Sequence, residues 1–199
     1  MNTYYSNEKW IQWLDQLANN DFVIIDQFIP NEILKKISYF FEQQQKLGNL
    51  TAAKIGPAEN EIKITEIRSD FTYWIDNSKD IELKPFFDFV EELIAQVSQY
   101  LFLSLQGFEF HLAKYPKGGF YKPHYDQFKS RNNRVLSLVV YLNDDWQQGD
   151  GGELKLHTPK ELILEPLMNR AILFRSDTVL HEVLPSFTER KSLTGWLLK

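Results

Sequence analysis

The chain has 199 residues, of which 43% are hydrophobic and 15% aromatic, so it is long enough to bury the core of one domain. Its formal net charge is −5 at pH 7, which argues against a nucleic-acid partner because phosphate binding depends on clustered lysine and arginine. The absence of cysteine excludes disulfides, thiolate catalysis, iron–sulfur clusters and zinc sites built from cysteine.

The first half of the chain is predicted to be mainly helical. Tryptophan and leucine recur at helical spacing within 4–17, and the apolar run at 22–28 predicts a strand. A second helix is expected over 30–48, where a proline stands at the start and a glycine at the end, and a third over 81–100. Between these two helices, 52–61 is rich in small and polar residues and is expected to be a mobile loop.

The second half changes to short runs at strand period, separated by glycine, asparagine and proline. The runs lie at 108–115, 121–127, 135–143, 152–158, 161–166, 170–176, 181–185 and 191–198. Eight short strands after a helical half predict an α+β protein with a jelly-roll core, that is, a double-stranded β-helix. We expect one domain over 1–199, in which 1–105 give helical support with two or three strands and 106–199 form the core.

No apolar run is long enough to cross a bilayer, so we expect no membrane partner and a cytoplasmic location.

A candidate metal site lies in the second predicted strand of this half. Residues two apart on a strand point to the same face, so His124 and Asp126 are expected to reach one ion together. His181, on a later strand, completes two histidines and one carboxylate. This facial set is typical of non-haem iron(II) oxygenases, because it leaves three positions open for a co-substrate and dioxygen. Alone, a His-x-Asp pair is a weak signal, and a surface turn with satisfied polar groups gives the same pattern.

Arg190 follows His181 by nine residues, with Pro185 between them. This spacing allows one strand to carry the histidine, a turn to reverse the chain, and the next strand to carry the arginine beside it. An arginine there is expected to form a bidentate pair with the distal carboxylate of a two-carboxylate 2-oxo acid.

Several further motifs follow in one order along the chain. They are Arg68-Ser-Asp70, Trp74-Ile, Tyr115-Pro, His124-x-Asp126, Tyr141-Leu-Asn-x-Asp-Trp146, Gly151-Gly-x-Leu154, His181-Glu-Val-x-Pro185 and Arg190-x-x-x-Thr194-x-Trp196. With these motifs, the chain from about Asp21 onward resembles the prolyl 4-hydroxylase branch of the 2-oxoglutarate oxygenases. The resemblance is to the hypoxia-inducible-factor prolyl hydroxylases and their bacterial relatives.

The resemblance implies roles for individual residues. Iron(II) would be held by His124, Asp126 and His181, and 2-oxoglutarate by Arg190. The remaining co-substrate contacts would come from Tyr115, Tyr141, Thr194 and Leu154, and the substrate contacts from Tyr121, Arg134, Trp196 and Asp70. Dioxygen would be the second co-substrate and ascorbate a helper.

Four further expectations concern the substrate side. Asp70 is expected to pair with Arg134, and the loop at 52–61 to close over a peptide. His111 stands near the pocket where relatives carry a different residue. Core packing alone would equally account for Trp196. On the co-substrate side, core packing would also account for Tyr141 and accounts better for Leu154, and Thr194 also fits an ordinary strand residue.

The function implied is hydroxylation of a proline in a protein or peptide, with a translation component as one candidate target. Hydroxylation of a free amino acid or other small molecule is an alternative, and a non-catalytic metal-binding jelly roll, with zinc or manganese, is another. Nucleic-acid demethylation is disfavoured, because those enzymes carry a second arginine where this chain has Trp196.

Overall fold

The computed structural model describes residues 3–53, 66–127 and 132–199. The helices are α1 (Asn7–Asn20), α2 (Asn31–Lys46), the short 3-10 helix η1 (Ile81–Leu83) and α4 (Lys84–Leu101). The first strands are β1 (Phe22–Ile25), β2 (Thr51–Ala52) and β3 (Phe71–Trp74). The later strands are β4 (Gly107–Tyr115), β5 (Tyr121–His124), β6 (Arg134–Tyr141), β7 (Leu154–Leu156), β8 (Leu162–Leu164), β9 (Ala171–Arg175), β10 (His181–Val183) and β11 (Arg190–Leu198).

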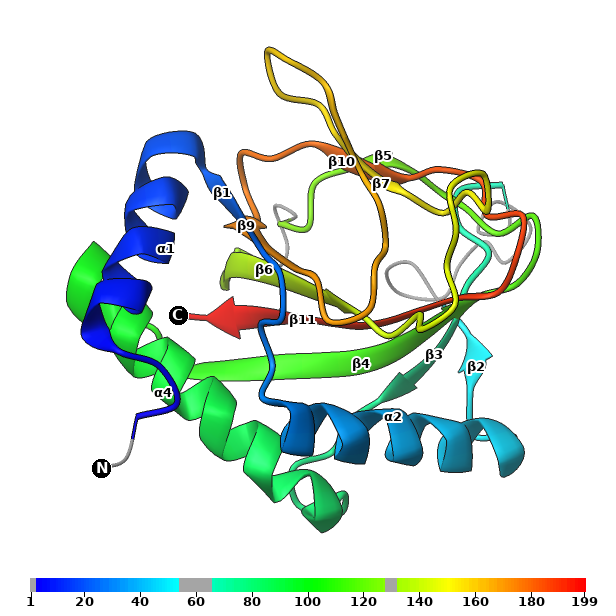
Figure 1. The fold of residues 1–199 in the computed structure, drawn as a ribbon, viewed down its shortest axis with the longest axis horizontal. Coiled ribbons are helices and arrows are strands. Elements are labelled where there is room, and N and C mark those ends of the chain that lie inside the picture. Colours follow the sequence, from blue (N-terminus) through cyan, green and yellow to red (C-terminus); the bar gives the residue numbers. More distant parts are fainter. Residues whose placement is uncertain (1–2, 54–65, 128–131) are drawn as a thin grey trace.

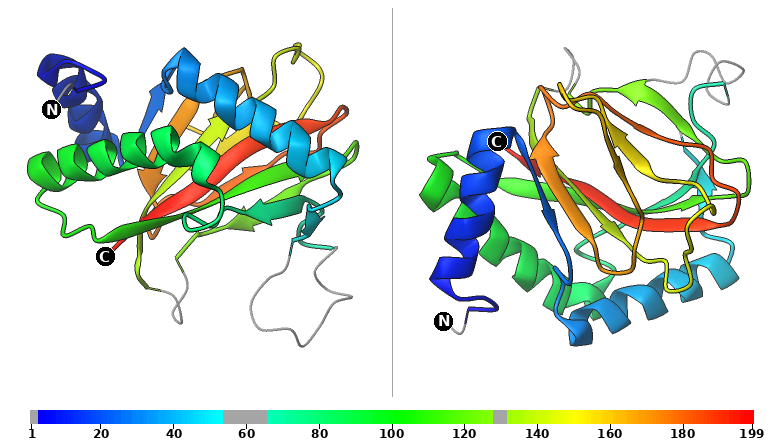
Figure 2. Two further views of the ribbon diagram at one scale, coloured as in Figure 1. Left: turned by 90° about the horizontal axis from the view of Figure 1, so that it is seen from below. Right: turned by 45° about the horizontal axis from the view of Figure 1, so that its top comes forward.

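The strands form two antiparallel sheets. The large sheet has the order β1-β9-β6-β11-β4-β3-β2 and the small sheet the order β5-β10-β7-β8. The small sheet lies over one face of the large sheet, and the helices lie on the other side (Figure 1). Seen from below, α2 and α4 run across the outer face of the large sheet (Figure 2). The predicted α+β fold with a jelly-roll core and N-terminal helical support is confirmed.

The central strands of the large sheet are buried on both faces, because one face meets the helices and the other meets the small sheet. On β6, Leu138 and Val140 belong to the apolar cluster beneath the helices, whereas Val139 and Tyr141 belong to the cluster between the sheets. The alternation of β6 therefore separates a structural face from a face that is available for a site.

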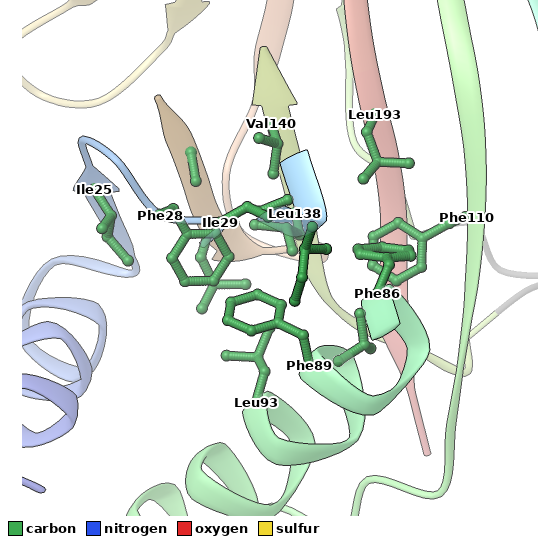
Figure 3. Packing of buried hydrophobic residues seen from close by; sticks show 14 of the residues in the cluster. Ile25, Phe28, Ile29, Phe86, Phe89, Leu93, Phe110, Leu138, Val140 and Leu193 are labelled. Atoms are coloured by element: carbon green, nitrogen blue, oxygen red, sulfur yellow. The ribbon is translucent and has the colours of Figure 1, made fainter. Parts of the chain in front are cut away.

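The helices are fixed to the large sheet by aromatic and aliphatic side chains. Phe86, Phe89 and Leu93 of α4 point toward Leu138 and Phe110 of the sheet (Figure 3). All five are at most 2% exposed. At the N-terminus of α1, the Ser6 hydroxyl accepts a hydrogen bond from the backbone N–H of Lys9 and caps the first turn.

All eight strands predicted after 106 are present, but the first half differs in detail. The strand predicted at 22–28 ends at Ile25, because Gln27 adopts a positive φ of 56° and turns the chain. The strand β3 (Phe71–Trp74) was not located in advance. Of the loop expected at 52–61, Ala52 belongs to β2, and residues 54–61 lie outside the described residues. Among the described residues, no helix combines the length and apolar character needed to cross a membrane.

Candidate metal centre

Three candidate metal ligands converge between the two sheets. His124 ends β5 and His181 begins β10, and the antiparallel pairing of these strands places the two residues directly opposite one another. Asp126 lies between them: its Oδ1 is 3.6 Å from His124 Nε2 and its Oδ2 is 3.6 Å from His181 Nε2. One ligand atom from each residue falls within 4.8 Å of the others. The structure therefore brings together the three predicted residues.

The route to this arrangement differs from the predicted one. Asp126 is not on a strand with His124, because β5 ends at His124 and Asp126 lies in a bend. A hydrogen bond from Ser137 Oγ on β6 to Asp126 Oδ2, at 2.7 Å, fixes the carboxylate instead. Ser137 Oγ also lies 2.8 Å from Ser176 Oγ. Sequence reasoning missed both serines, since a serine within an apolar strand carries no motif.

Both histidines are oriented by backbone carbonyls. His124 Nδ1 lies 2.8 Å from the carbonyl oxygen of Lys122, and His181 Nδ1 lies 3.1 Å from that of Val179. A carbonyl can only accept, so each Nδ1 carries the proton and each Nε2 presents its lone pair toward Asp126. Histidine ligands in metal sites are commonly oriented in this way by a second partner.

The protonation states of these residues also suit a cation. Burial lowers the pKa of His181 to about 4, so its imidazole is neutral. Burial acts to raise the pKa of Asp126, but the neighbouring His181 and His124 and the hydrogen bond from Ser137 outweigh it and leave that pKa far below its usual range. Two neutral imidazoles and one ionised carboxylate are the forms that bind iron(II). The donor set therefore fits iron(II).

Arg190 begins β11, and its guanidinium lies in the same interior. The residue is 2% exposed, and its Nε donates to the carbonyl of Gly152 at 2.8 Å. In the described part of the chain, no carboxylate forms an ion pair with it. A buried cation without a counter-charge is costly, so this position calls for an anionic ligand.

Two tyrosines flank this guanidinium. The Cζ atom of Arg190 lies 4.8 Å from the ring centre of Tyr115 and 5.0 Å from that of Tyr141. The Tyr141 hydroxyl is buried and has no partner among the described residues. An orphaned phenol beside an unpaired guanidinium fits a ligand with carboxylate oxygens, such as a dicarboxylic acid.

Two other predicted co-substrate contacts have different surroundings. Thr194 does not contact Arg190 directly: its Oγ1 lies 3.2 Å from Ser192 Oγ, which accepts from Arg190 Nη1 at 3.3 Å. Ser192 was missed by sequence reasoning. Leu154 is 1% exposed, faces Val183 across the small sheet, and packs in the apolar cluster between the sheets. Leu154 thus forms part of the apolar wall.

One aromatic ring, that of Tyr121, stacks against His124. The ring centre of Tyr121 lies 3.5 Å from that of His124 at an interplanar angle of 17°, and the Cζ atom of Arg68 lies 4.4 Å from the ring centre of Tyr121. Arg68 makes two hydrogen bonds to Asp70, at 2.7 and 2.5 Å. The expected pairing of Asp70 with Arg134 is therefore wrong.

Arg134 has a partner of its own. Its Nη2 lies 2.6 Å from Glu109 Oε1, because Glu109 on β4 and Arg134 on β6 flank the same strand, β11. The Cζ atom of Arg134 lies 3.4 Å from the ring centre of Trp196. The four predicted substrate-side residues thus gather in two groups: Tyr121 with Asp70, and Arg134 with Trp196.

The chain matches known proteins in sequence and structure. Residues 110–198 match the family model of the 2OG-Fe(II) oxygenase superfamily. A hypoxia-inducible factor prolyl hydroxylase from Caenorhabditis elegans is 27% identical over 191 residues, which are 88% of this chain and 26% of that protein. The chain therefore spans about a quarter of the length of that relative.

Solved structures give broader coverage. A prolyl-4-hydroxylase from Pseudomonas putida is 32% identical and superposes with a TM-score of 0.86, covering 96% of this chain and 99% of that one. A prolyl hydroxylase from Trichoplax adhaerens, solved with a hypoxia-inducible-factor peptide fragment, has the same TM-score of 0.86 at 24% identity, over 96% and 89% of the two chains. The second likeness supports the fold alone.

Proposed function

The chain belongs to the 2OG-Fe(II) oxygenase superfamily, in its prolyl hydroxylase branch, and from this premise we propose that it hydroxylates a proline within a peptide or protein. The observation that carries the proposal is the convergence of three ligand atoms within 4.8 Å of one another, in the same interior as a buried guanidinium that has no ion-pair partner among the described residues. That combination matches a metal that works with a dicarboxylic co-substrate.

We assign the metal to His124, Asp126 and His181. Iron(II), with dioxygen and 2-oxoglutarate, supplies the oxidising power for C–H hydroxylation, and 2-oxoglutarate leaves as succinate and carbon dioxide. The protein keeps the imidazole of His181 neutral, holds Asp126 ionised and fixes its orientation through Ser137. These residues set the donor geometry and exclude water, because Asp126 and His181 are only 6% and 4% exposed.

We assign the co-substrate to the Arg190 end of the site. The guanidinium would pair with the carboxylate that lies farther from the metal, and Tyr141 Oη would donate to the same ligand. Tyr115 and Leu154 would wall this pocket, and Thr194 would orient Arg190 through Ser192. Gly152 contributes its carbonyl to Arg190 Nε at 2.8 Å and keeps the guanidinium from turning away.

We assign the substrate to the side formed by Tyr121, Arg134, Trp196 and Asp70. Support comes from the aromatic character of this side. A translation component is one candidate target, and ascorbate is expected to sustain turnover by keeping iron reduced. A cytoplasmic location stays a prediction, which fractionation of cells expressing the tagged chain would test.

The decisive experiment measures succinate release with iron(II), 2-oxoglutarate and ascorbate. Pentapeptides with a central proline and varied neighbours are supplied, with free proline as a separate arm, and mass spectrometry follows the gain of one oxygen atom. Hydroxylation of a peptide supports the proposal. Hydroxylation of free proline alone would favour the small-molecule alternative, and the absence of succinate in every arm would favour a non-catalytic metal-binding module.

A further inference from the structure

Three buried polar atoms without a hydrogen-bond partner among the described residues lie on one face of the large sheet. Two other such atoms, Ser38 Oγ and Ser98 Oγ, lie on the helices α2 and α4. The three on the sheet are Tyr141 Oη, His111 Nδ1 and Trp196 Nε1, all on strands that face the site. The proposed co-substrate accounts for Tyr141, so the two nitrogens still need a partner.

The two nitrogens belong to neighbouring rings on the metal side of the interior. The rings of His111 on β4 and Trp196 on β11 are stacked, with centres 5.4 Å apart at 25°. Trp196 faces Ser137 across the sheet, and Ser137 is the residue that bonds to Asp126. Arg190 stands at the opposite end of β11, so the pair is separate from the co-substrate end.

The charges around this pair differ from those around Arg190. Both arginines on this side are neutralised, Arg68 by Asp70 at 2.5 Å and Arg134 by Glu109 at 2.6 Å. The described residues near Arg190 offer it no such carboxylate. One end of the interior is therefore suited to an anion, and the His111 end is suited to an uncharged polar group.

The hydrogen-bonding capacity of the two rings limits which uncharged polar groups can bind at the His111 end. The indole N–H of Trp196 can only donate, so its partner must be an acceptor. Burial, and next the charge of Arg68, lower the pKa of His111 to about 3, so the imidazole is neutral and one of its nitrogens accepts. An extended peptide presents the carbonyl acceptor and the N–H donor of one residue on the same side, whereas a carboxylate offers acceptors alone.

We propose that His111 and Trp196 form a subsite that binds the backbone of one residue beside the target proline, with Trp196 Nε1 donating to the carbonyl of that residue and His111 Nδ1 accepting from its N–H. The inference rests on the proposed function and deepens it, because it selects a peptide over a free amino acid.

Trp74 closes this subsite. Its ring is 4.8 Å from His111 and 6.0 Å from Trp196, and the residue is 49% exposed. Binding of a peptide to the two nitrogens would require this indole to move aside.

The test uses the proline pentapeptide that turns over best and two ester analogues of it. One ester replaces the peptide group directly after proline, and the other replaces the last N–H-bearing peptide group before it. In the wild-type protein, one ester is expected to raise the KM for peptide about three- to tenfold, which is the effect of one lost hydrogen bond. The same KM for both esters and the parent peptide would overturn the inference while leaving prolyl hydroxylation intact.

Variants identify the acceptor. His111→Leu is expected to raise the KM for the parent peptide relative to the KM for 2-oxoglutarate, and to remove the discrimination against the ester. His111→Asn, whose side-chain oxygen can stand near the position of Nδ1, is expected to restore both. Ser98→Ala removes an orphaned buried hydroxyl from α4 and is the matched control, with discrimination unchanged. Discrimination that persists in His111→Leu contradicts the assignment.

A binding measurement does not depend on the variants' stability or on turnover. The chain has four histidines, so nitrogen NMR of the zinc-loaded protein should show four sets of imidazole signals. The set that disappears in His111→Asn is assigned to His111. The parent peptide is expected to shift the Nδ1 resonance, and the discriminating ester to shift it much less. Equal shifts with both ligands would overturn the subsite. Failure of the wild-type protein to bind or hydroxylate any proline peptide would instead refute the proposed function, and the inference with it.

Discussion

Ser137 donates its hydroxyl to Asp126 Oδ2 at 2.7 Å, and this bond ties the large sheet to the metal centre. Asp126 lies in a bend beyond the end of β5, and its backbone carbonyl accepts a hydrogen bond from Arg134 Nη1 at 3.4 Å rather than from a strand. The buried hydroxyl of Ser137, which also lies 2.8 Å from Ser176 Oγ, holds the Asp126 side chain in the position that strand pairing would otherwise fix. The orientation of the only carboxylate ligand therefore depends on a residue from the opposite sheet.

We expect Ser137→Ala to weaken metal binding by about 10- to 100-fold, the range usual for partners that orient a ligand. Titration with iron(II) or manganese(II) without oxygen would measure this loss. Ser176→Ala leaves the bond from Ser137 to Asp126 in place, so it should have a smaller effect. An unchanged metal affinity in Ser137→Ala would show that the bend holds Asp126 without help.

Much of this site was predictable because its signal is local. The strands carrying His124, His181 and Arg190 follow from alternating apolar residues and turn-formers. The spacing between His181 and Arg190 was expected to place Arg190 on the strand beside that of His181. In the structure the two residues lie on different sheets, because β10 belongs to the small sheet and β11 to the large one. The chain crosses between sheets in the turn, and periodicity carries no information about such a crossing.

The unpredicted parts depend on cross-strand register. Glu109 reaches Arg134 because both flank β11, and Arg68 reaches Asp70 two residues away. From sequence alone, either acid can be assigned to either arginine, so the pairing of Asp70 with Arg134 was wrong. Ser137 and Ser192 were missed because a serine becomes a site residue only through what lies opposite it.

We expect His124→Ala and Asp126→Ala to lose iron(II) binding and succinate release while keeping the fold. The apolar clusters that stabilise the sheets do not include either side chain, so circular dichroism should be unchanged. His157→Ala is the control and should keep activity, because His157 follows β7, lies 3.0 Å from Glu182 Oε1 and is not one of the three clustered ligands. Normal turnover in either ligand variant contradicts the assignment of the metal site.

Arg190→Ala should weaken 2-oxoglutarate binding by roughly 3 kcal/mol, about a hundredfold, the order expected for one partner of a buried charge pair. Arg190→Lys keeps the charge but loses the planar fork, so an intermediate loss is expected. Calorimetric titration of the manganese-loaded protein with 2-oxoglutarate would measure both. Equal affinities in the alanine variant and the wild type would place the distal carboxylate elsewhere.

The stability of the protein should fall in mild acid because of His111. Burial first, and the charge of Arg68 next, lower its pKa to about 3 in the folded chain, against about 6.5 when unfolded. As the pH falls, the unfolded chain therefore takes up the proton first. The contribution is fully present above about pH 6.5 and is lost progressively toward about pH 3.

Urea unfolding of the metal-free protein at several pH values tests the predicted effect of His111 on stability. Between about pH 7.5 and pH 5, His111 should remove about 2 kcal/mol from the free energy of unfolding, a loss that His111→Asn should lack. If the two proteins lose stability in parallel, His111 is not held neutral in the folded state.

Gly152 couples the small sheet's turn to Arg190. It adopts a positive φ of 76°, which side chains disfavour, and an added Cβ would lie 2.9 Å from Arg190 Cδ and 2.8 Å from Ser186 Oγ. Gly152→Ala is therefore expected to cost about 1–3 kcal/mol of stability and to push the guanidinium from its place. Since Gly152 also accepts the hydrogen bond from Arg190 Nε at 2.8 Å, 2-oxoglutarate affinity should fall with stability.

Gly149→Ala is a control that introduces backbone strain without displacing the Arg190 guanidinium. Gly149 also has a positive φ, 103°, but an added Cβ there has no neighbour within 4 Å. We expect Gly149→Ala to lower the free energy of unfolding while leaving 2-oxoglutarate affinity unchanged, because its strain is not transmitted to Arg190. Urea unfolding and calorimetric titration of both variants would distinguish the effects. If Gly152→Ala loses stability alone, the guanidinium is held by its tyrosine neighbours rather than by the turn.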